Sequence, residues 1–376
     1  MKNTALYIHI PFCDHKCIYC DFYSIITKDN AIIFLSSLKK EAEYFSNLYS
    51  KDRIITSIFF GGGTPSLMEP EYLKEIIENL KTNFTVADNA EITMETNPGT
   101  VDKSKLKKFK DAGINRISIG IQSFDEDDLK FLTRIHDKQT AIQTVYNAAE
   151  VGFENINIDL IFNLPIQTMG KWIDNLSIAI TLPIKHISAY SLILERGTIL
   201  NKLVIDKKVM IHDADYDADL YETTIDFLSS NGFYQYEVSN FTKPDYECVH
   251  NNAYWRYHDY IGLGTSAHSF VEGKRWWNFS SLKKYINEVN LNGHAVMNTE
   301  ALTLNQMHDE YVMLALRSYG LDLNDYKKRF DGLWIEKQKY YFELLHNENL
   351  LTIQNDWIKL TAKGYALCDE ILKNIL

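Results

Sequence analysis

The sequence predicts an α/β fold: an open, incomplete (β/α)6 barrel of the TIM type, followed by a mainly helical C-terminal region. Apolar runs alternate with helical stretches from Leu6 to about Tyr190, which is typical of a parallel sheet with right-handed crossovers. Polar and glycine-rich motifs recur directly after the strand candidates, where α/β folds place their chemistry. Six strand–helix units fit an open barrel better than a closed barrel of eight.

Each predicted element has its own signal in the sequence. Runs rich in apolar and β-branched residues predict six strands: Leu6–Ile10, Ile54–Phe60, Glu91–Glu95, Arg116–Ile121, Asn155–Phe162 and His186–Ser191. Apolar residues at helical spacing predict five helices between them: Ala31–Leu48, Glu71–Asn83, Ser104–Ala112, Thr140–Val151 and Met169–Thr181. A further helix, Asp213–Ser230, begins among acidic residues and ends at Asn231-Gly232, a good C-terminal signal.

The pattern changes after about Gly197. Glycine- and aromatic-rich loops are predicted for Tyr234–Phe279, and a mainly helical part begins at Ser281. The end of the chain fits a hairpin and a closing helix, as in a winged-helix module: Asn349–Ile353, Trp357–Leu360 and Ala362–Leu372. The predicted division is a barrel core of residues 1–200, a connecting region of 201–280 and a helical domain of 281–376.

Charge and composition limit the function classes. A formal net charge of −11 argues against a nucleic-acid partner, because phosphate binding relies on clustered Lys and Arg. The basic stretch Lys103–Lys110 is interpreted as a solvated helix face, and the winged-helix-like end is assigned a structural role. No segment approaches the roughly 18 consecutive apolar residues of a membrane span. Low cysteine usage predicts a reducing, cytoplasmic location.

Three cysteines, Cys13, Cys17 and Cys20, form a C-x3-C-x2-C motif. Three thiolates alone cannot satisfy four-coordinate zinc, and the usual zinc pattern pairs two Cys-x-x-Cys units. They can hold three corners of a cubic [4Fe–4S] cluster and leave the fourth iron open to another ligand. Because the chain has only five cysteines, this spacing favours a cluster over surface thiols or a partial zinc site.

Further motifs follow the predicted strands. Ile58–Ser66 is an apolar strand that runs into Gly-Gly-Gly-Thr-Pro, which is either a simple turn or a backbone cradle for a polar headgroup. It is not a P-loop, because no Gly-Lys-Ser/Thr follows. Glu95 ends a strand, and Gln122 follows a buried-looking one. Arg134 is a cation suited to a carboxylate, and Asp159 lies in an apolar strand, where it needs a partner.

The cysteine spacing and the aromatic residues after it resemble the radical S-adenosylmethionine (SAM) superfamily. With Tyr7 and the motifs above, nearly the whole chain resembles the oxygen-independent coproporphyrinogen oxidase-like subfamily. The resemblance implies a radical SAM barrel in which Cys13, Cys17 and Cys20 ligate the [4Fe–4S] cluster and SAM binds its open iron. It also implies the SAM contacts: Tyr7, Gly62 and Glu95 for this SAM, Tyr19 at its adenine, and Gly63, Thr64, Gln122, Arg134 and Asp159 at positions that bind a second SAM in the oxidase. Whether one or two SAM molecules bind stays open.

Two departures from the oxidase pattern instead resemble the haem chaperones of this subfamily. Phe22 replaces a further cysteine of the oxidase, and only twelve residues precede the first cysteine. The chaperones also have a His-Asn-x-x-Tyr-Trp motif, matched here from His250. His250 and Cys248 are candidate iron ligands, and Tyr254 and Trp255 offer flat faces to a porphyrin. Packing in a core or at a loop rim is the alternative interpretation of these residues.

The resemblance implies a chaperone that carries haem as cargo to recipient haem proteins such as respiratory enzymes. It also implies a homodimer linked to cluster and SAM binding. Whether the protein visits the membrane during delivery stays open. Two alternatives stay open: a coproporphyrinogen III oxidase that decarboxylates two propionates, and a radical SAM enzyme acting on another substrate.

Overall fold

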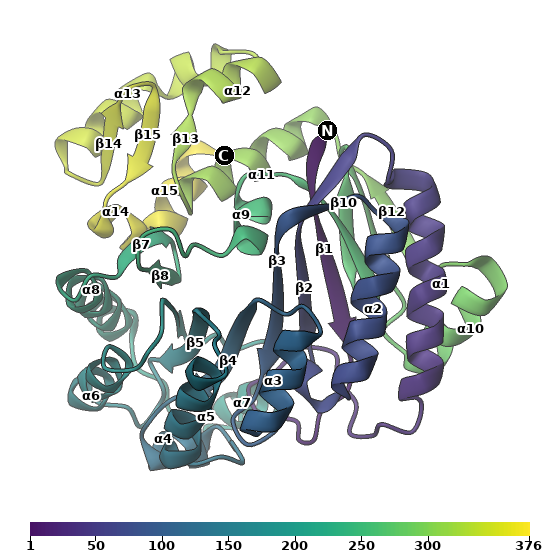
Figure 1. Ribbon diagram of the computed structural model, residues 1–376. Helices are drawn as coiled ribbons and strands as arrows, with labels where there is room; N and C mark the ends of the chain where they lie inside the picture. The colour runs from purple at the N-terminus through teal and green to yellow at the C-terminus, as the bar shows by residue number, and fades with distance from the viewer.

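One large curved sheet forms the body of the molecule, and the computed structural model describes residues 1–376 (Figure 1). The sheet has 12 strands in the order β12-β11-β10-β9-β1-β2-β3-β4-β5-β6-β8-β7. Neighbouring strands from β9 through β1 to β6 run parallel, and antiparallel strands extend the sheet on both sides. Because β12 and β7 do not pair with each other, the barrel is open, as predicted.

The bounds of the elements are as follows. The strands of the large sheet are β1 (Lys2–Ile10), β2 (Arg53–Gly62), β3 (Val86–Thr96), β4 (Arg116–Gln122), β5 (Asn155–Phe162), β6 (His186–Ser191), β7 (Tyr234–Glu237), β8 (Asn240–Thr242), β9 (Asp259–Gly264), β10 (His268–Val271), β11 (Lys274–Asn278) and β12 (Val296–Ala301). The helices of this part are α1 (Ala31–Tyr49), α2 (Pro70–Asn83), α3 (Lys103–Asp111), α4 (Glu126–Phe131), α5 (Lys138–Glu150), α6 (Met169–Ala179), α7 (Ile199–Ile205), α8 (Ala214–Ser230), α9 (Val249–Trp255) and α10 (Leu282–Asn292).

Several of these helices begin where a side chain caps their first amide groups. Asp102, Asp137, Thr168 and Asp213 each accept a hydrogen bond from the backbone N–H three residues further on. The helices then cover the outer face of the sheet, with α10 beside α1, α1 beside α2, α2 beside α3, α3 beside α5 and α6 beside α8 (Figure 1). Buried apolar residues of both layers form one core of 56 residues, which holds the parallel strands in place.

The loops predicted for Tyr234–Phe279 were wrong, because this segment forms β7 to β11 and helix α9. These strands are only three to six residues long, so the sequence offers too few residues for an alternating pattern. The glycines in them serve close packing: a Cβ on Gly262 would lie 2.2 Å from the carbonyl oxygen of His268. β9 pairs in parallel with β1 and so adds a seventh parallel strand to the six predicted.

The end of the chain forms a second, smaller core of 15 buried residues. Its elements are α11 (Leu304–Leu316), β13 (Leu321–Asp322), α12 (Leu323–Arg329), α13 (Leu333–Asn347), β14 (Leu351–Gln354), β15 (Trp357–Leu360), α14 (Ala362–Ala366) and α15 (Cys368–Ile375). The predicted hairpin is confirmed, since β14 and β15 pair antiparallel across a turn in which Asn355 and Asp356 have positive φ. The closing helix is interrupted at Leu367, so it is two helices. The division of the chain at residues 200 and 280 stays a prediction.

The basic stretch on α3 is an exposed helix face paired with acidic neighbours. Lys103 pairs with Glu150, and Lys108 pairs with Glu71, through exposed side chains. These pairs agree with the interpretation as a solvated face. No helix in the structure combines the length and the apolar character that crossing a bilayer requires.

Candidate functional site

The three predicted cluster cysteines lie on one loop at the carboxyl edge of the parallel strands. The loop leaves β1 at Ile10 and closes on itself: the Ile25 amide donates to the Pro11 carbonyl at 2.8 Å, and the Cys13 amide donates to the Ile25 carbonyl at 3.0 Å. We call residues 11–25 the cysteine loop. These two hydrogen bonds hold the two ends of the loop together, so that the three thiols are presented from one short segment.

Glycines at the end of β2 seat this loop. The Gly63 amide donates to the Ile10 carbonyl, and the Thr64 amide donates to the Phe12 carbonyl, both at 2.8 Å. A Cβ on Gly63 would lie only 2.5 Å from the Phe12 carbonyl oxygen, and a Cβ on Gly62, where φ is +109°, would lie 2.6 Å from the His9 ring. The Gly-Gly-Gly run is therefore needed for the backbone of β2 to reach the cysteine loop.

The turn after α4 holds the loop from its other side. Thr133, with φ +56°, accepts the Ile18 amide at 3.3 Å, and its hydroxyl lies 3.2 Å from His15 Nε2. Arg134 Nη1 points at Cys17 Sγ, 3.6 Å away, while its Nη2 donates to Gly120 O at 2.6 Å. Arg134 thus places a half-buried cation against a predicted cluster ligand.

Two residues that organise the site, Asn97 and Thr133, were not predicted from the sequence. Asn97 accepts from Arg134 Nη2 at 2.7 Å and donates to Thr64 Oγ1 at 3.0 Å, and Thr64 Oγ1 in turn lies 3.3 Å from Cys13 Sγ. Thr133 is the second such residue. The only signal for Asn97 is its place in Glu-Thr-Asn-Pro directly after a strand, and Thr133 has no signal beyond its neighbour Arg134.

A cavity of about 440 Å³ opens beside the cysteine loop. We call it the upper cavity. It brings together nearly all of the predicted cluster and SAM residues, namely Cys13, Cys17, Tyr19, Cys20, Gly62, Gly63, Thr64, Glu95, Gln122, Arg134 and Asp159. Gln122 has φ +71° and lies where the β4–β5 register shifts, a strained backbone of the kind found at functional sites. Of the residues predicted to bind SAM, Tyr7 alone lies outside this wall.

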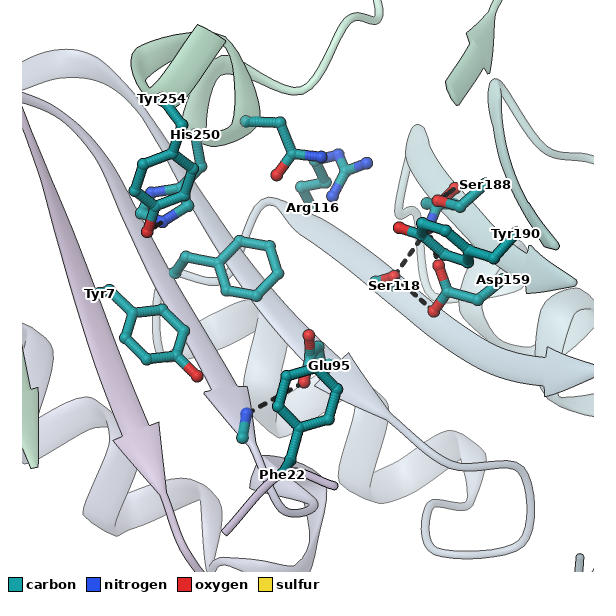
Figure 2. Close-up of a pocket in the computed structure, with 14 residues that line it drawn as sticks. Tyr7, Phe22, Glu95, Arg116, Ser118, Asp159, Ser188, Tyr190, His250 and Tyr254 are labelled. Carbon is teal, nitrogen blue, oxygen red and sulfur yellow. Dashed lines mark hydrogen bonds between the residues drawn. The ribbon is translucent and has the colours of Figure 1, made fainter. Parts of the chain in front are cut away.

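A second cavity of about 300 Å³ lies further inside the barrel, and we call it the lumen cavity (Figure 2). Tyr7 lines it. It shares five lining residues with the upper cavity, so the two spaces adjoin: Phe22, Gly62, Glu95, Asp159 and Tyr190. The remainder of its wall is mostly polar, from strands β4, β5 and β6 and helix α9.

Two carboxyl groups stand where the cavities meet. Glu95 accepts the Gly62 amide at 3.2 Å. Burial raises the pKa of Glu95 to about 8, and the charge of Asp159 adds to the rise. Burial also raises the pKa of Asp159, which accepts from Ser118 at 3.1 Å and from Asn157 at 2.8 Å. The raised pKa of Glu95 favours its protonated form, and a nearby cation such as an ammonium group would favour its ionised form.

The residues predicted to bind haem are carried by helix α9 and the residue before it, and two of them, His250 and Tyr254, line the lumen cavity opposite Phe22 of the cysteine loop. His250 is 2% exposed, with Nδ1 3.0 Å from Ser57 Oγ and Nε2 2.9 Å from the Tyr254 hydroxyl. Burial lowers its pKa to about 3, so the ring is neutral. A haem iron can reach His250 only if one of these hydrogen bonds opens. The haem-ligand role of His250 stays a prediction.

Helix α9, which carries this motif, closes one end of the barrel. Glu91 accepts the backbone amides of Val249 and His250, both at 3.1 Å, and the Cys248 thiol at 3.5 Å. Cys248 is fully buried. Trp255 is half-buried at the end of α9 and lines neither cavity, so the structure does not bring it together with His250 in one pocket.

The cysteine loop suits a multi-iron cluster better than a single ion. No group of three or more His, Cys, Asp or Glu side chains is gathered as the ligands of one metal ion would be. A four-iron cluster instead takes each cysteine at a separate corner. The three thiols share one cavity wall, with Arg134 beside Cys17 to balance negative charge, and so the residues present fit such a cluster.

Comparison with known proteins gives a consistent result. The model of the radical SAM superfamily matches residues 7–177. The chain is 32% identical to the haem chaperone HemW of Bacillus subtilis, over 99% of this chain and 98% of that protein. It is 39% identical to HemW of Escherichia coli over 72% of this chain and 71% of that protein. It is also 35% identical to the mitochondrial radical S-adenosyl methionine domain-containing protein 1 of Danio rerio, over 100% of this chain and 87% of that protein.

Among solved structures, the coproporphyrinogen III oxidase HemN of Escherichia coli superposes with a TM-score of 0.83 at 24% sequence identity. The superposition covers 100% of this chain and 90% of that one. At this identity the match shows a shared fold, from the first strand to the C-terminal module.

Proposed function

This chain belongs to the radical SAM superfamily and, within it, to the HemW haem chaperone family, and from that premise we propose that it binds haem and delivers it to haem proteins. The observation that carries the proposal is the extent of the similarity to a haem chaperone, which covers 99% of this chain and 98% of the relative. The likeness thus includes the C-terminal module and α9 as well as the cysteine loop.

The superfamily implies a [4Fe–4S] cluster and SAM, and the side chains around the upper cavity support specific roles. Cys13, Cys17 and Cys20 would hold three irons, and the two cofactors together supply one-electron radical chemistry when bound. Gly62 and Glu95 would receive the polar end of SAM, because Glu95 can give up its proton to face an ammonium group. This chain's part is to bind and orient the two groups.

The haem-binding role rests on helix α9. Its His-Asn-x-x-Tyr-Trp motif supplies a neutral imidazole, which is the form that ligates iron. In the proposed function the Tyr254 hydroxyl releases His250 Nε2 when haem arrives. In this proposal the recipients are haem proteins such as respiratory enzymes, and delivery brings the protein to the membrane. The working form is a homodimer.

The test is an anaerobic assay on protein whose cluster has been reconstituted to about four irons per chain. Haem is added, and its transfer to an apo-haem protein is followed by the absorbance of the product. In parallel, SAM, a reductant and coproporphyrinogen III are supplied, and protoporphyrinogen is measured. We expect stoichiometric haem binding, transfer of haem, and no protoporphyrinogen.

Protoporphyrinogen formed over many turnovers would make the protein a coproporphyrinogen III oxidase despite Phe22, and the chaperone proposal would fall. The cluster assignment is checked with Cys17→Ala, which should lose the iron. Cys368→Ala is the matched control, because Cys368 is buried in the C-terminal core and should leave the iron content unchanged.

A further inference from the structure

Arg116 at the start of β4 is a buried cation that lines the lumen cavity and lacks hydrogen-bond partners. It is 2% exposed, and its Nε has no hydrogen-bond partner. Glu91 balances its charge, but Glu91 Oε2 lies 3.8 Å from Nε, beyond the roughly 3.2 Å limit of an N–H···O hydrogen bond. Both oxygens of Glu91 already accept amides of α9. Buried guanidinium groups normally have acceptors for their five N–H donors, so this one is poised for an acceptor from the cavity.

The rest of the lumen wall is arranged to receive such an acceptor. Figure 2 shows the Arg116 guanidinium between the His250–Tyr254 pair and the group formed by Ser118, Asp159 and Ser188. The acids of the wall have their own donors: Asp159 is held by Ser118 and Asn157, and Glu95 by a backbone amide. The donors of Arg116 therefore stay available.

We propose that Arg116 anchors the carboxylate of a small organic acid bound in the lumen cavity. Arg binds carboxylates through two parallel N–H···O bonds, which this planar group can provide. At about 300 Å³ the cavity is at the lower end of the range for small-molecule sites, roughly 300–1,000 Å³, so it suits a small acid and not a tetrapyrrole. A singly charged carboxylate is favoured over the more highly charged phosphate because Asp159 lines the same space. His250 and Tyr254 line the same cavity, so a bound acid and a haem held by His250 would exclude each other.

The site is tested by calorimetric titration of the cluster-loaded protein with three probes. Propionate carries one negative charge. Propionamide has the same shape but no charge, and inorganic phosphate carries more negative charge than propionate. We expect saturable propionate binding, at least tenfold weaker binding of propionamide, and phosphate weaker than propionate. Arg116→Gln should remove the preference for the acid over the amide, and Arg116→Lys should retain it with weaker binding.

A second pair of variants covers the possibility that changes at the buried Arg116 unfold the protein. Asn251 lines the lumen cavity, so Asn251→Asp places a negative charge on its wall and should weaken propionate binding at least tenfold. Asn252→Asp is the matched control: the Asn252 amide donates to the Tyr319 hydroxyl at 3.0 Å, outside the lumen. This variant should bind propionate like the wild type.

The proposal is overturned if protein with four irons binds no propionate, if propionate and propionamide bind equally, or if Asn251→Asp and Asn252→Asp bind propionate alike. Haem binding is measured on the same sample, so that failure of the propionate site can be distinguished from failure of the proposed haem-chaperone function.

Discussion

At the scale of single residues, the site depends on backbone contacts that only glycine allows. Gly63 lies in the wall of the upper cavity and donates its amide to the strand that leads into the cysteine loop. The Phe12 carbonyl that any Cβ on Gly63 would strike is backbone, so it cannot turn away as a side chain would. The absence of a Cβ at Gly63 therefore determines where the three thiols lie.

Gly63→Ala should therefore displace the cysteine loop. The clash at 2.5 Å forces backbone movement, and overpacking of this kind costs about 1–3 kcal/mol of unfolding free energy. We expect the iron content after reconstitution to fall by at least half. Gly332→Ala is the control, because nothing lies within 4 Å of its added Cβ, and it should change stability by less than about 0.5 kcal/mol. Full iron content in Gly63→Ala would contradict the argument.

The sequence predicted which residues form the site and in what order they occur better than it predicted how their side chains are oriented. The cysteine spacing and the polar residues after strands predicted the wall of the upper cavity, because parallel strands end at one edge of a sheet. Asn97 and Thr133 were not predicted, since their roles arise from contacts between distant segments. His250 was recognised as a candidate ligand, but its burial and its two partners depend on the seating of α9, which no local pattern encodes.

At the scale of elements, helix α1 is tied to the sheet by a buried carboxyl group. Glu41 accepts the Gly264 amide at 2.8 Å, the Asn278 amide at 2.7 Å and the Tyr285 hydroxyl at 2.6 Å. These partners belong to β9, β11 and α10, so one side chain links α1 to three elements beyond residue 250. A glutamate within an amphipathic helix is normally expected on the solvated face, and the sequence pattern therefore gives no sign of this link.

Glu41 should make stability depend on pH. Burial raises its pKa from 4.5 to about 7, so between these values the folded protein holds a proton that the unfolded chain has released. Stability then falls as the pH rises through this window, by up to about 3 kcal/mol. Urea unfolding of cluster-free protein at pH 5 and pH 8 measures it. The stability of the wild type relative to Glu41→Gln should decrease between the two pH values; a constant difference would rule out the shift.

In the molecule as a whole, the core of the barrel and the core of the C-terminal module are separate, and the module and the cysteine loop lie at different ends of the barrel. The C-terminal module joins the barrel far from the cysteine loop, through the Val238 amide, which donates to the Arg317 carbonyl at 2.9 Å, and through the contact of Asn252 with Tyr319. Its buried residues form a separate cluster from those of the barrel. Packing changes in the module should therefore leave the cofactor end intact.

Leu316→Ala tests this independence. Leu316 is fully buried in the second core, and truncation of such a side chain costs about 2–5 kcal/mol. Hydrogen exchange should quicken across residues 311–375, while the iron content stays at the wild-type value. Leu333→Ala, at a position 65% exposed, should change neither. Loss of iron in Leu316→Ala would show that the two cores are coupled.

The position of β1 in the middle of the sheet has a consequence for synthesis on the ribosome. β1 needs β2 on one side and β9 on the other, and β9 begins only at Asp259. At typical translation rates, β1 waits for its second neighbour for roughly 10–50 s after it emerges. During that time an apolar strand edge lies beside three free thiols. Nascent chains interrupted before β9 should therefore be prone to aggregate and to form intermolecular disulfides.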